Sequence, residues 1–292
     1  MIQHIRIISP SGVIDPAYID GAAARLRTWG FTVSEGHHAR DVWGRFAGTD
    51  EDRLADLIEA LCDPSVDLVL CARGGYGLQR IIDRVPTITK PILGFSDITA
   101  LHQWAGICGQ VSLHGIMCKH IATLPEDSEP IQALRKALAG EALEYQWASH
   151  PLNRPGEAYG TIVGGNLSVL YGLQGTPFSL SKLSYQFPIL LIEDIGERHY
   201  HIDRMIRNLR MSGVLAHLSG LIVGQFTDCE EDPLMPSSIA QTINEAVADY
   251  DYPVIFDAPF GHVEHNLPLW MHRHASIHCG ANSILRLNSV EV

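Results

Sequence analysis

The first part of the chain alternates between short apolar runs and segments with helical spacing, and this alternation limits the possible folds most strongly. The expected elements follow one another as 4–8 (strand), 16–29 (helix), 31–33 (strand), 50–62 (helix) and 66–72 (strand). The run at 66–72 is apolar throughout, as expected of a strand covered on both faces. Strands and helices in alternation predict an α/β fold with a doubly wound parallel sheet.

A strand, a turn and a helix are expected within residues 91–108. Pro91 to Gly94 predicts a buried strand, and a helix is expected from Asp97 onward. Ser96 lies on the turn between them, where its hydroxyl would point out of the sheet edge beside the N–H groups of a helix N-terminus. This is the geometry of a nucleophile elbow, although the pattern is Gly-x-Ser-Asp. A serine that only caps a helix is the ordinary alternative.

A glycine cluster, Arg73-Gly74-Gly75-Tyr76-Gly77, follows the apolar run at 66–72. Glycines allow the main chain to approach a ligand closely. Because this loop and Ser96 follow neighbouring strands, we expect the N–H groups of Gly75 and Asp97 to form a two-donor oxyanion hole. The alternative is a tight turn without a ligand, since the cluster lacks the phosphate-loop pattern.

The second half of the chain has a different pattern. A strand over 111–118 is expected to end the first domain, and 121–157 predicts a linker with one polar helix near 128–139. The elements expected beyond it are short segments broken by turns at 160–166 and 175–177, strands at 188–192, 218–226 and 254–256, helices at 201–212 and 237–249, and alternating strands over 273–288. Short mixed strands with few helices predict a small, barrel-like domain. The expected division is therefore 1–120, 121–157 and 158–292.

Glu193 and His262 each follow an apolar strand, where loops commonly carry functional residues. Together with Ser96 they give the chain order Ser, Glu, His that is found in α/β hydrolases. A carboxylate in such a place is more often ion-paired or capping, and a histidine there is more often structural. The order alone therefore does not establish a catalytic triad.

A metal site is weighed because the chain has 15 histidines. His262-x-x-His265 and His272-x-His274 have the spacing of ligand pairs. However, no H-E-x-x-H is present and no cysteine stands near them at zinc spacing. Arg273 lies inside the second pair and would repel a cation. We therefore expect no metal.

Charge and composition exclude several classes of function. The net charge of −12 argues against nucleic acid or an anionic membrane surface as a partner. No apolar run approaches the roughly 18 residues of a membrane span, and the amino terminus runs into a strand without the regions of a signal peptide. The six cysteines form no C-x-x-C pair, which favours reduced thiols in the cytoplasm.

Short motifs along nearly the whole chain match one enzyme family. They are Ser9-Pro10-Ser11-Gly12, Arg45-Phe46-Ala47-Gly48-Thr49, Arg73-Gly74-Gly75-Tyr76-Gly77, Gly94-Phe95-Ser96-Asp97-Ile98-Thr99-Ala100, His114-Gly115, Gly164-Gly165-Asn166-Leu167, Gly175-Thr176-Pro177, Glu193-Asp194-Ile195, Asp203-Arg204-Met205 and Phe260-Gly261-His262. In these motifs the chain resembles the L,D-carboxypeptidases that act on murein tetrapeptides. This family of serine peptidases also includes the microcin C immunity peptidases.

The resemblance implies a flavodoxin-like amino-terminal domain, a barrel-like carboxy-terminal domain and a cytoplasmic homodimer without cofactor. It implies Ser96 as nucleophile, Glu193 as acid and His262 as base, acting on a murein tetrapeptide to release its terminal D-alanine. Arg73 and Arg204 are the candidates for binding substrate carboxylates, since a guanidinium offers two hydrogen bonds; a structural ion pair is the alternative for either.

The chain departs from the family pattern at two positions. Ile116 replaces a proline, and Trp270 replaces the glycine of a Leu-Pro-Leu-Gly motif. The bulky Trp270 is expected to affect the local backbone and substrate preference. Two other functions remain open: a self-immunity peptidase that cleaves peptidyl-nucleotide antibiotics of the microcin C type, and a non-catalytic small-ligand binder. The first would need an aromatic residue to stack on adenine, and no insertion carrying one is evident.

Overall fold

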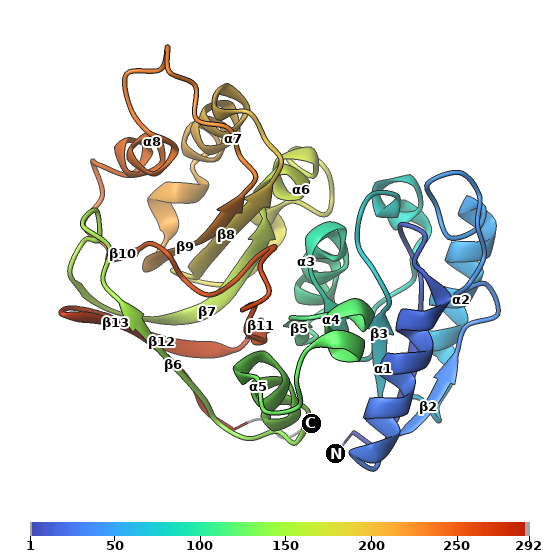
Figure 1. The fold of residues 1–292 in the computed structure, drawn as a ribbon. Coiled ribbons are helices and arrows are strands. Elements are labelled where there is room, and N and C mark those ends of the chain that lie inside the picture. The colour runs from blue at the N-terminus through green and yellow to red at the C-terminus, as the bar shows by residue number, and fades with distance from the viewer. Residues whose placement is uncertain (1, 290–292) are drawn as a thin grey trace. The chain divides into compact units, whose positions relative to one another are not determined.

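The computed structural model describes residues 2–289, which form two compact units that each combine helices with a sheet (Figure 1). The mixed α/β fold class is therefore confirmed. The first unit contains the chain up to Glu141 and the later segment Glu264–Met271; the second contains Ala142–Val263 and His272–Asn288. The chain thus returns to the first unit for one short segment after building most of the second.

The first unit is built on a six-stranded sheet with the strand order β11-β5-β4-β3-β1-β2. The strands are β1 (His4–Ile8), β2 (Thr32–Glu35), β3 (Leu68–Cys71), β4 (Ile92–Gly94), β5 (Ser112–His114) and β11 (Leu269–Met271). Strands β1 to β5 pair in parallel, and β11 joins β5 antiparallel. A parallel sheet brings its functional loops to the carboxyl ends of the strands.

The helices of the first unit begin where the sequence offers caps. They are α1 (Pro16–Thr28), α2 (Asp50–Cys62), α3 (Thr99–Ile107), α4 (Cys118–Thr123) and α5 (Glu129–Leu138). The Asp15 side chain accepts from the Ala17 N–H at the start of α1. Thr49 and Asp52 form a reciprocal capping box at the start of α2, which occupies the predicted range 50–62.

The predicted strand over 111–118 is wrong beyond His114. The Gly115 N–H still donates to the Gly94 carbonyl, but the chain then leaves the sheet and α4 begins at Cys118. Apolar character alone cannot distinguish a buried strand from a buried helix start. Trp270 lies fully buried in β11 opposite Leu113.

The second unit is built on a seven-stranded sheet with the order β10-β9-β8-β7-β12-β13-β6. The strands are β6 (Leu143–Ala148), β7 (Gly156–Asn166), β8 (Ile189–Ile195), β9 (Gly220–Thr227), β10 (Val254–Ile255), β12 (His274–Cys279) and β13 (Asn282–Leu287). Strands β7 to β10 pair in parallel, whereas β6, β12 and β13 pair antiparallel. The long β7 joins the two parts of this curved sheet (Figure 1).

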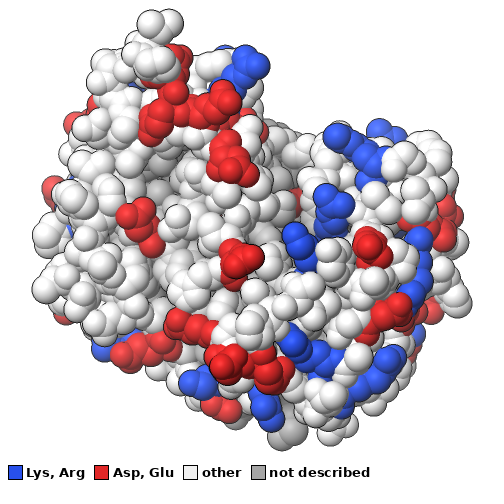
Figure 2. All heavy atoms as spheres, viewed as in Figure 1, with Lys and Arg blue, Asp and Glu red and all other residues white. Residues whose placement is uncertain are grey.

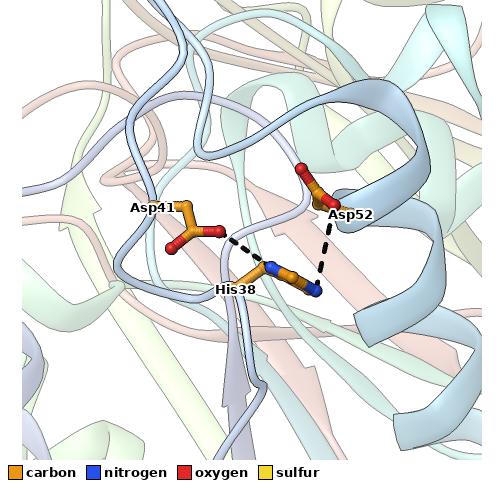
Figure 3. A group of neighbouring side chains, drawn as sticks. All are labelled: His38, Asp41 and Asp52. Carbon is orange, nitrogen blue, oxygen red and sulfur yellow. Dashed lines mark hydrogen bonds and ion pairs between the residues drawn. The ribbon is translucent and has the colours of Figure 1, made fainter.

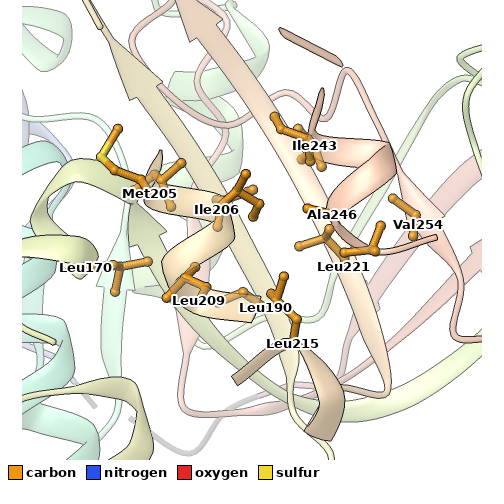
Figure 4. Packing of buried hydrophobic residues seen from close by; sticks show 14 of the residues in the cluster. Leu170, Leu190, Met205, Ile206, Leu209, Leu215, Leu221, Ile243, Ala246 and Val254 are labelled. Carbon is orange, nitrogen blue, oxygen red and sulfur yellow. The ribbon is translucent and has the colours of Figure 1, made fainter. Parts of the chain in front are cut away.

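Three helices, α6 (Leu167–Gly172), α7 (His199–Met211) and α8 (Ile239–Ala246), belong to this unit. The apolar face of α7 packs on β8 and β9 through residues such as Ile206, Leu209 and Leu221 (Figure 4). Burial of each such side chain stabilises a fold by roughly 1.5–3 kcal/mol. This core fixes the strand ends that carry Glu193.

The prediction of short broken segments at 160–166 is wrong, because β7 continues through its glycines. Gly164 and Gly165 have φ of 113° and 130°. A β-carbon on Gly164 would lie 2.0 Å from the Leu191 carbonyl oxygen. These glycines therefore allow close strand pairing instead of ending the strand.

Candidate active site

Ser96 lies on a sharp turn in which its backbone φ is +67°. This left-handed conformation costs a residue with a β-carbon roughly 1–2 kcal/mol. Strand β4 ends at Gly94, the 3₁₀ turn η3 (Ser96–Ile98) begins at the serine, and α3 follows. The serine is only partly buried although both neighbours are buried. The fold thus presents its side chain at the carboxyl edge of the first sheet.

The loop after β3 packs directly against this turn. A β-carbon on Gly74 would lie 2.8 Å from the Ser96 Cβ and 3.0 Å from the Phe95 carbonyl oxygen. The Gly12 N–H donates to the Gly74 carbonyl at 3.0 Å. Only glycine therefore allows the loop to lie so close to Ser96.

The Asp97 carboxylate ties three loops together. It is buried, and it accepts from the Ser11 hydroxyl at 2.7 Å and from the Leu78 N–H at 2.9 Å. Burial raises the pKa of this carboxyl, whereas both donors oppose the rise. The carboxylate thus fixes the Ser96 turn to the loops that begin after β1 and β3.

The two proposed oxyanion donors lie in this same set of loops. Gly75 is exposed, with φ of +102°. The Asp97 N–H precedes the first hydrogen bond of η3, which runs from the Ile98 N–H to the Phe95 carbonyl. Such an N–H has no acceptor within its own helical turn. Gly75 follows Gly74, which packs against Ser96, and Asp97 directly follows Ser96, so both residues belong to the first unit.

Glu193 and His262 are hydrogen-bonded to each other in the second unit. Glu193 is fully buried near the end of β8, and its Oε2 lies 2.8 Å from Nδ1 of His262. The carboxylate accepts the Nδ1 proton, so Nε2 is the nitrogen with the available lone pair. Glu193 Oε1 has no hydrogen-bond partner among the described residues. A buried carboxylate with one partner depends strongly on that partner.

Glycines make room for this pair. A β-carbon on Gly261 would lie 3.1 Å from Glu193 Oε2, and one on Gly224 would lie 2.4 Å from the Phe260 carbonyl oxygen. Gly261 has φ of +131°, and the Gln225 N–H donates to the Phe260 carbonyl at 2.9 Å. The segment before His262 therefore packs against the end of β9, next to Glu193.

Asp194 follows Glu193 and holds the start of α6. It accepts from the Asn166 amide and from the Ser168 N–H, each at 2.8 Å. Burial and the neighbouring Glu193 carboxylate raise the pKa of Asp194 to about 7. Asp194 thus organises the carboxyl ends of β7 and β8, where Glu193 lies.

The two arginines proposed for substrate binding have different surroundings. Arg73 is exposed in the first unit and donates to the Val13 carbonyl at 2.6 Å. Arg204 is exposed on α7 in the second unit, with its guanidinium 5.5 Å from the Tyr200 ring. Neither forms an ion pair with a residue in the described part of the chain.

The histidines considered as metal ligands contact acidic or aromatic side chains, lie in different units or are exposed. His265 lies 2.8 Å from Glu129 in the first unit, whereas His262 lies in the second. The His272 ring stacks on Tyr185, and His274 is exposed on β12.

Among residues 2–289, one group brings three metal-type ligand atoms within 4.8 Å: His38, Asp41 and Asp52 (Figure 3). His38 Nδ1 lies 2.7 Å from Asp41, and its Nε2 lies 3.9 Å from Asp52. The hydrogen bond to Asp41 raises the pKa of His38. The other Asp52 oxygen accepts from the Thr49 N–H at the start of α2. The three side chains are thus held by ion pairs and by a helix cap.

Figure 2 shows acidic and basic side chains interspersed on one face, without a single extended basic surface. Within the described residues, no helix has the length and apolar character that a bilayer-spanning segment needs.

Sequence reasoning did not find the contacts made by the Ser11 and Asp97 side chains or the close packing of the Gly261 backbone against Glu193. All three residues belong to motifs named above, and these motifs are the available signal. The contacts themselves depend on loops brought together only by the fold.

Comparison with known proteins identifies the family. Residues 5–115 match the LD-carboxypeptidase N-terminal domain, and residues 159–277 match the LD-carboxypeptidase C-terminal domain. A Bacillus subtilis protein named "Probable murein peptide carboxypeptidase" is 34% identical over 271 residues, covering 88% of this chain and 83% of that protein. The murein tetrapeptide carboxypeptidase of Pseudomonas aeruginosa is 28% identical over 277 residues, covering 90% and 89%.

Solved structures agree with this assignment. The crystal structure of muramoyltetrapeptide carboxypeptidase from Oxalobacter formigenes matches with a TM-score of 0.88 at 26% identity, covering 99% of this chain and 100% of that one. The microcin C7 self-immunity protein MccF, in complex with aspartyl sulfamoyl adenosine, matches with a TM-score of 0.83 at 17% identity, covering 99% and 97%. This second likeness shows a shared fold. The chain belongs to the LD-carboxypeptidase family.

Proposed function

We propose that this protein is a serine L,D-carboxypeptidase that releases the terminal D-alanine of murein tetrapeptides during cell-wall recycling in the cytoplasm. The family supports carboxypeptidase chemistry, and a named murein tetrapeptide relative supports the substrate. All six cysteines are free, which suits a reducing compartment.

In the proposed mechanism Ser96 is the nucleophile. His262 Nε2 accepts the Ser96 proton while Oγ attacks the carbonyl carbon of the scissile peptide bond. His262 then donates that proton to the amine of D-alanine, which departs and leaves an acyl-enzyme ester on Ser96. Water, deprotonated by His262, attacks the ester carbonyl; His262 then returns that proton to Ser96 Oγ, and the shortened peptide leaves with a new carboxylate. The chemistry requires the two units to bring Ser96 and His262 together during turnover.

The other residues stabilise charge in these steps. Glu193 orients the imidazole through Nδ1 and stabilises the imidazolium that forms. The Gly75 and Asp97 amides are proposed to donate to the developing oxyanion, where loss of one donor costs roughly 3–4 kcal/mol in comparable enzymes. Arg73 or Arg204 is proposed to bind a substrate carboxylate.

One observation carries this proposal: the fully buried Glu193 is hydrogen-bonded to His262 at 2.8 Å. Burying a carboxylate is costly, and pairing it with an imidazole sets the tautomer that a general base needs. The strained backbone of Ser96 adds support, because such strain is concentrated at functional sites.

The test is release of D-alanine from purified murein tetrapeptide. Wild-type enzyme should release it with a burst of one equivalent if deacylation is slow, and Ser96→Ala should remain folded and release none. Arg27→Ala serves as a control, because Arg27 donates to the Val33 carbonyl away from these loops. Equal activity of Ser96→Ala and wild type would refute the nucleophile assignment.

A peptidyl-nucleotide substrate is the second candidate, favoured by the fold shared with the microcin C7 self-immunity protein. The same assay with an aminoacyl sulfamoyl adenosine compares the two. Cleavage of the adenosine conjugate alone would replace the murein substrate but keep the serine chemistry.

A further inference from the structure

Three aromatic rings form an exposed surface in the first unit that the proposed mechanism does not use. Trp43 and Tyr76 are 49% and 44% exposed, and Phe46 lies between them. The Phe46 ring centroid is 5.8 Å from that of Trp43 and 6.0 Å from that of Tyr76. We call these three residues the aromatic platform. Large aromatic side chains at a surface commonly mark a binding site.

The platform is held in position before any ligand arrives. Trp43 and Phe46 exchange two main-chain hydrogen bonds, of 2.8 and 3.1 Å, which close a tight turn. The guanidinium of Arg53 lies 5.0 Å from the Phe46 ring centroid. Arg53 is itself fully buried and donates to the Pro10 carbonyl at 2.7 Å. Rings that are already ordered lose little conformational entropy on binding.

The platform belongs to the same set of loops as Ser96. Phe46 forms a bridge with Gly12, and the Val13 N–H donates to the Arg45 carbonyl at 3.0 Å. Gly12 in turn donates to Gly74, the residue that packs against Ser96. The platform is therefore connected to the nucleophile turn through short main-chain contacts within one unit.

Two arginines give this surface positive charge. Arg45 and Arg73 are exposed, and within the described residues neither forms an ion pair. By contrast, the nearby Arg53 and Arg80 are paired with Asp50. A free amino-terminal ammonium would be repelled here, whereas an amino terminus acylated by a sugar acid carries no positive charge.

The size of the platform indicates which part of a substrate it would contact. The leaving group in the proposed reaction is a single alanine, which is much smaller than three rings. The platform therefore fits the retained part of the substrate. In muramyl peptides the amino terminus of that part carries a sugar, whose ring has apolar C–H faces that pack well on an indole.

We propose that the aromatic platform binds the sugar attached to the amino terminus of the substrate peptide, so that sugar-linked tetrapeptide is preferred over free tetrapeptide. This inference rests on the proposed function. Trp43 supplies the stacking surface, and Arg45 and Arg73 favour substrates without an amino-terminal positive charge. A nucleotide-linked sugar, which adds a diphosphate, would gain further from the two arginines.

The test compares kcat/KM for free tetrapeptide and for muramyl tetrapeptide. Wild type should prefer the muramyl form by about tenfold or more, and Trp43→Ala should remove most of this preference, chiefly through KM. Trp43→Phe should retain part of it. Trp29→Ala is the matched control, because Trp29 caps the far end of α1 at the opposite edge of the sheet. It should leave the preference intact.

Binding is measured separately by calorimetry of muramyl tetrapeptide with the Ser96→Ala protein. Adding Trp43→Ala should raise Kd about tenfold, while circular dichroism checks that the variants are folded. Arg45→Glu should lower kcat/KM for nucleotide-linked tetrapeptide more than for the muramyl form. If it lowers both equally, the sugar alone is the ligand.

Equal wild-type kcat/KM for free and muramyl tetrapeptide would overturn the inference and leave the proposed function standing. The same conclusion follows if Trp43→Ala lowers both values by one factor. If wild type releases no D-alanine from free, muramyl or nucleotide-linked tetrapeptide, both proposals are overturned.

Discussion

Ser96 combines a partly exposed position with a backbone conformation that residues with a β-carbon rarely adopt. Its φ of +67° places it among five non-glycine residues with positive φ in the described chain. The motif does not predict the value of φ, although a nucleophile elbow implies a strained turn. The strain is tolerated because Gly74 and Asp97 hold the turn from both sides.

Relief of this strain gives a measurable prediction. Ser96→Gly should be more stable than Ser96→Ala by about 1 kcal/mol, because only glycine adopts positive φ without cost. Urea unfolding of the two variants measures the difference. Equal or lower stability of the glycine variant would contradict the assigned backbone conformation.

The buried pair of Glu193 and His262 gives a second prediction. His262→Ala should lower the free energy of unfolding by about 3 kcal/mol, because it leaves a buried carboxylate without its partner. Adding Glu193→Leu to that variant should recover at least half of the loss. Thermal or urea unfolding of the two variants gives both values. A further loss in the double variant would show that the carboxylate has another stabilising partner.

At the scale of elements, close contact between loops sets the geometry around the nucleophile. Gly74→Ala should lower kcat at least about 100-fold with a smaller change in KM, because its β-carbon would displace Ser96. Gly280→Ala is the control, since its β-carbon would meet only the end of the His278 side chain. Circular dichroism should be unchanged in both. Full activity of Gly74→Ala would place Ser96 farther from this loop.

Elements with strong local signals were predictable from sequence. Helix α2 has the expected range because Thr49 supplies its cap and apolar residues repeat at helical spacing. The sequence pattern does not indicate strand β7, because its glycines also signal turns, and β11 has only three residues, which are ordered by pairing with β5. Local patterns lack the pairing information that decides both cases.

For the candidate site, the sequence indicates the chemical groups but not the contacts around them. Ser96, Glu193 and His262 stand at strand ends or turns, and their motifs are recognisable. The Ser11–Asp97 hydrogen bond and the contacts of Trp43 with Phe46 were not predictable, because each depends on several loops folding together. The sequence alone therefore indicates chemical groups more readily than the contacts that position them.

The pH dependence of stability concerns the whole molecule. His102 is fully buried with Nε2 2.9 Å from the Gly94 carbonyl, and burial lowers its pKa to about 4. Below pH 6.5 the unfolded chain binds a proton that the folded chain excludes. Stability should therefore be full above pH 6.5 and fall as the pH drops toward 4, by on the order of 3 kcal/mol from this group.

His102→Gln should reduce this loss, because glutamine can donate to the same carbonyl without titrating. Urea unfolding between pH 7.5 and pH 4.5 compares the two proteins, with His217→Gln as the control for an exposed histidine. The raised pKa of His38 acts in the opposite direction, so its stabilisation is full at low pH and is lost as the pH rises. Equal slopes for wild type and His102→Gln would refute the role of His102.

We propose that His262 and Glu193 of the second unit activate Ser96 of the first unit during turnover. The most direct measurement uses a phosphonate analogue of the tetrapeptide, which forms a covalent bond with an activated serine, followed by mass spectrometry of the digested protein. We expect one adduct, located on Ser96, whose rate of formation falls at least about 100-fold in His262→Ala and in Glu193→Gln. An adduct on another residue, or an unchanged rate in both variants, would contradict it.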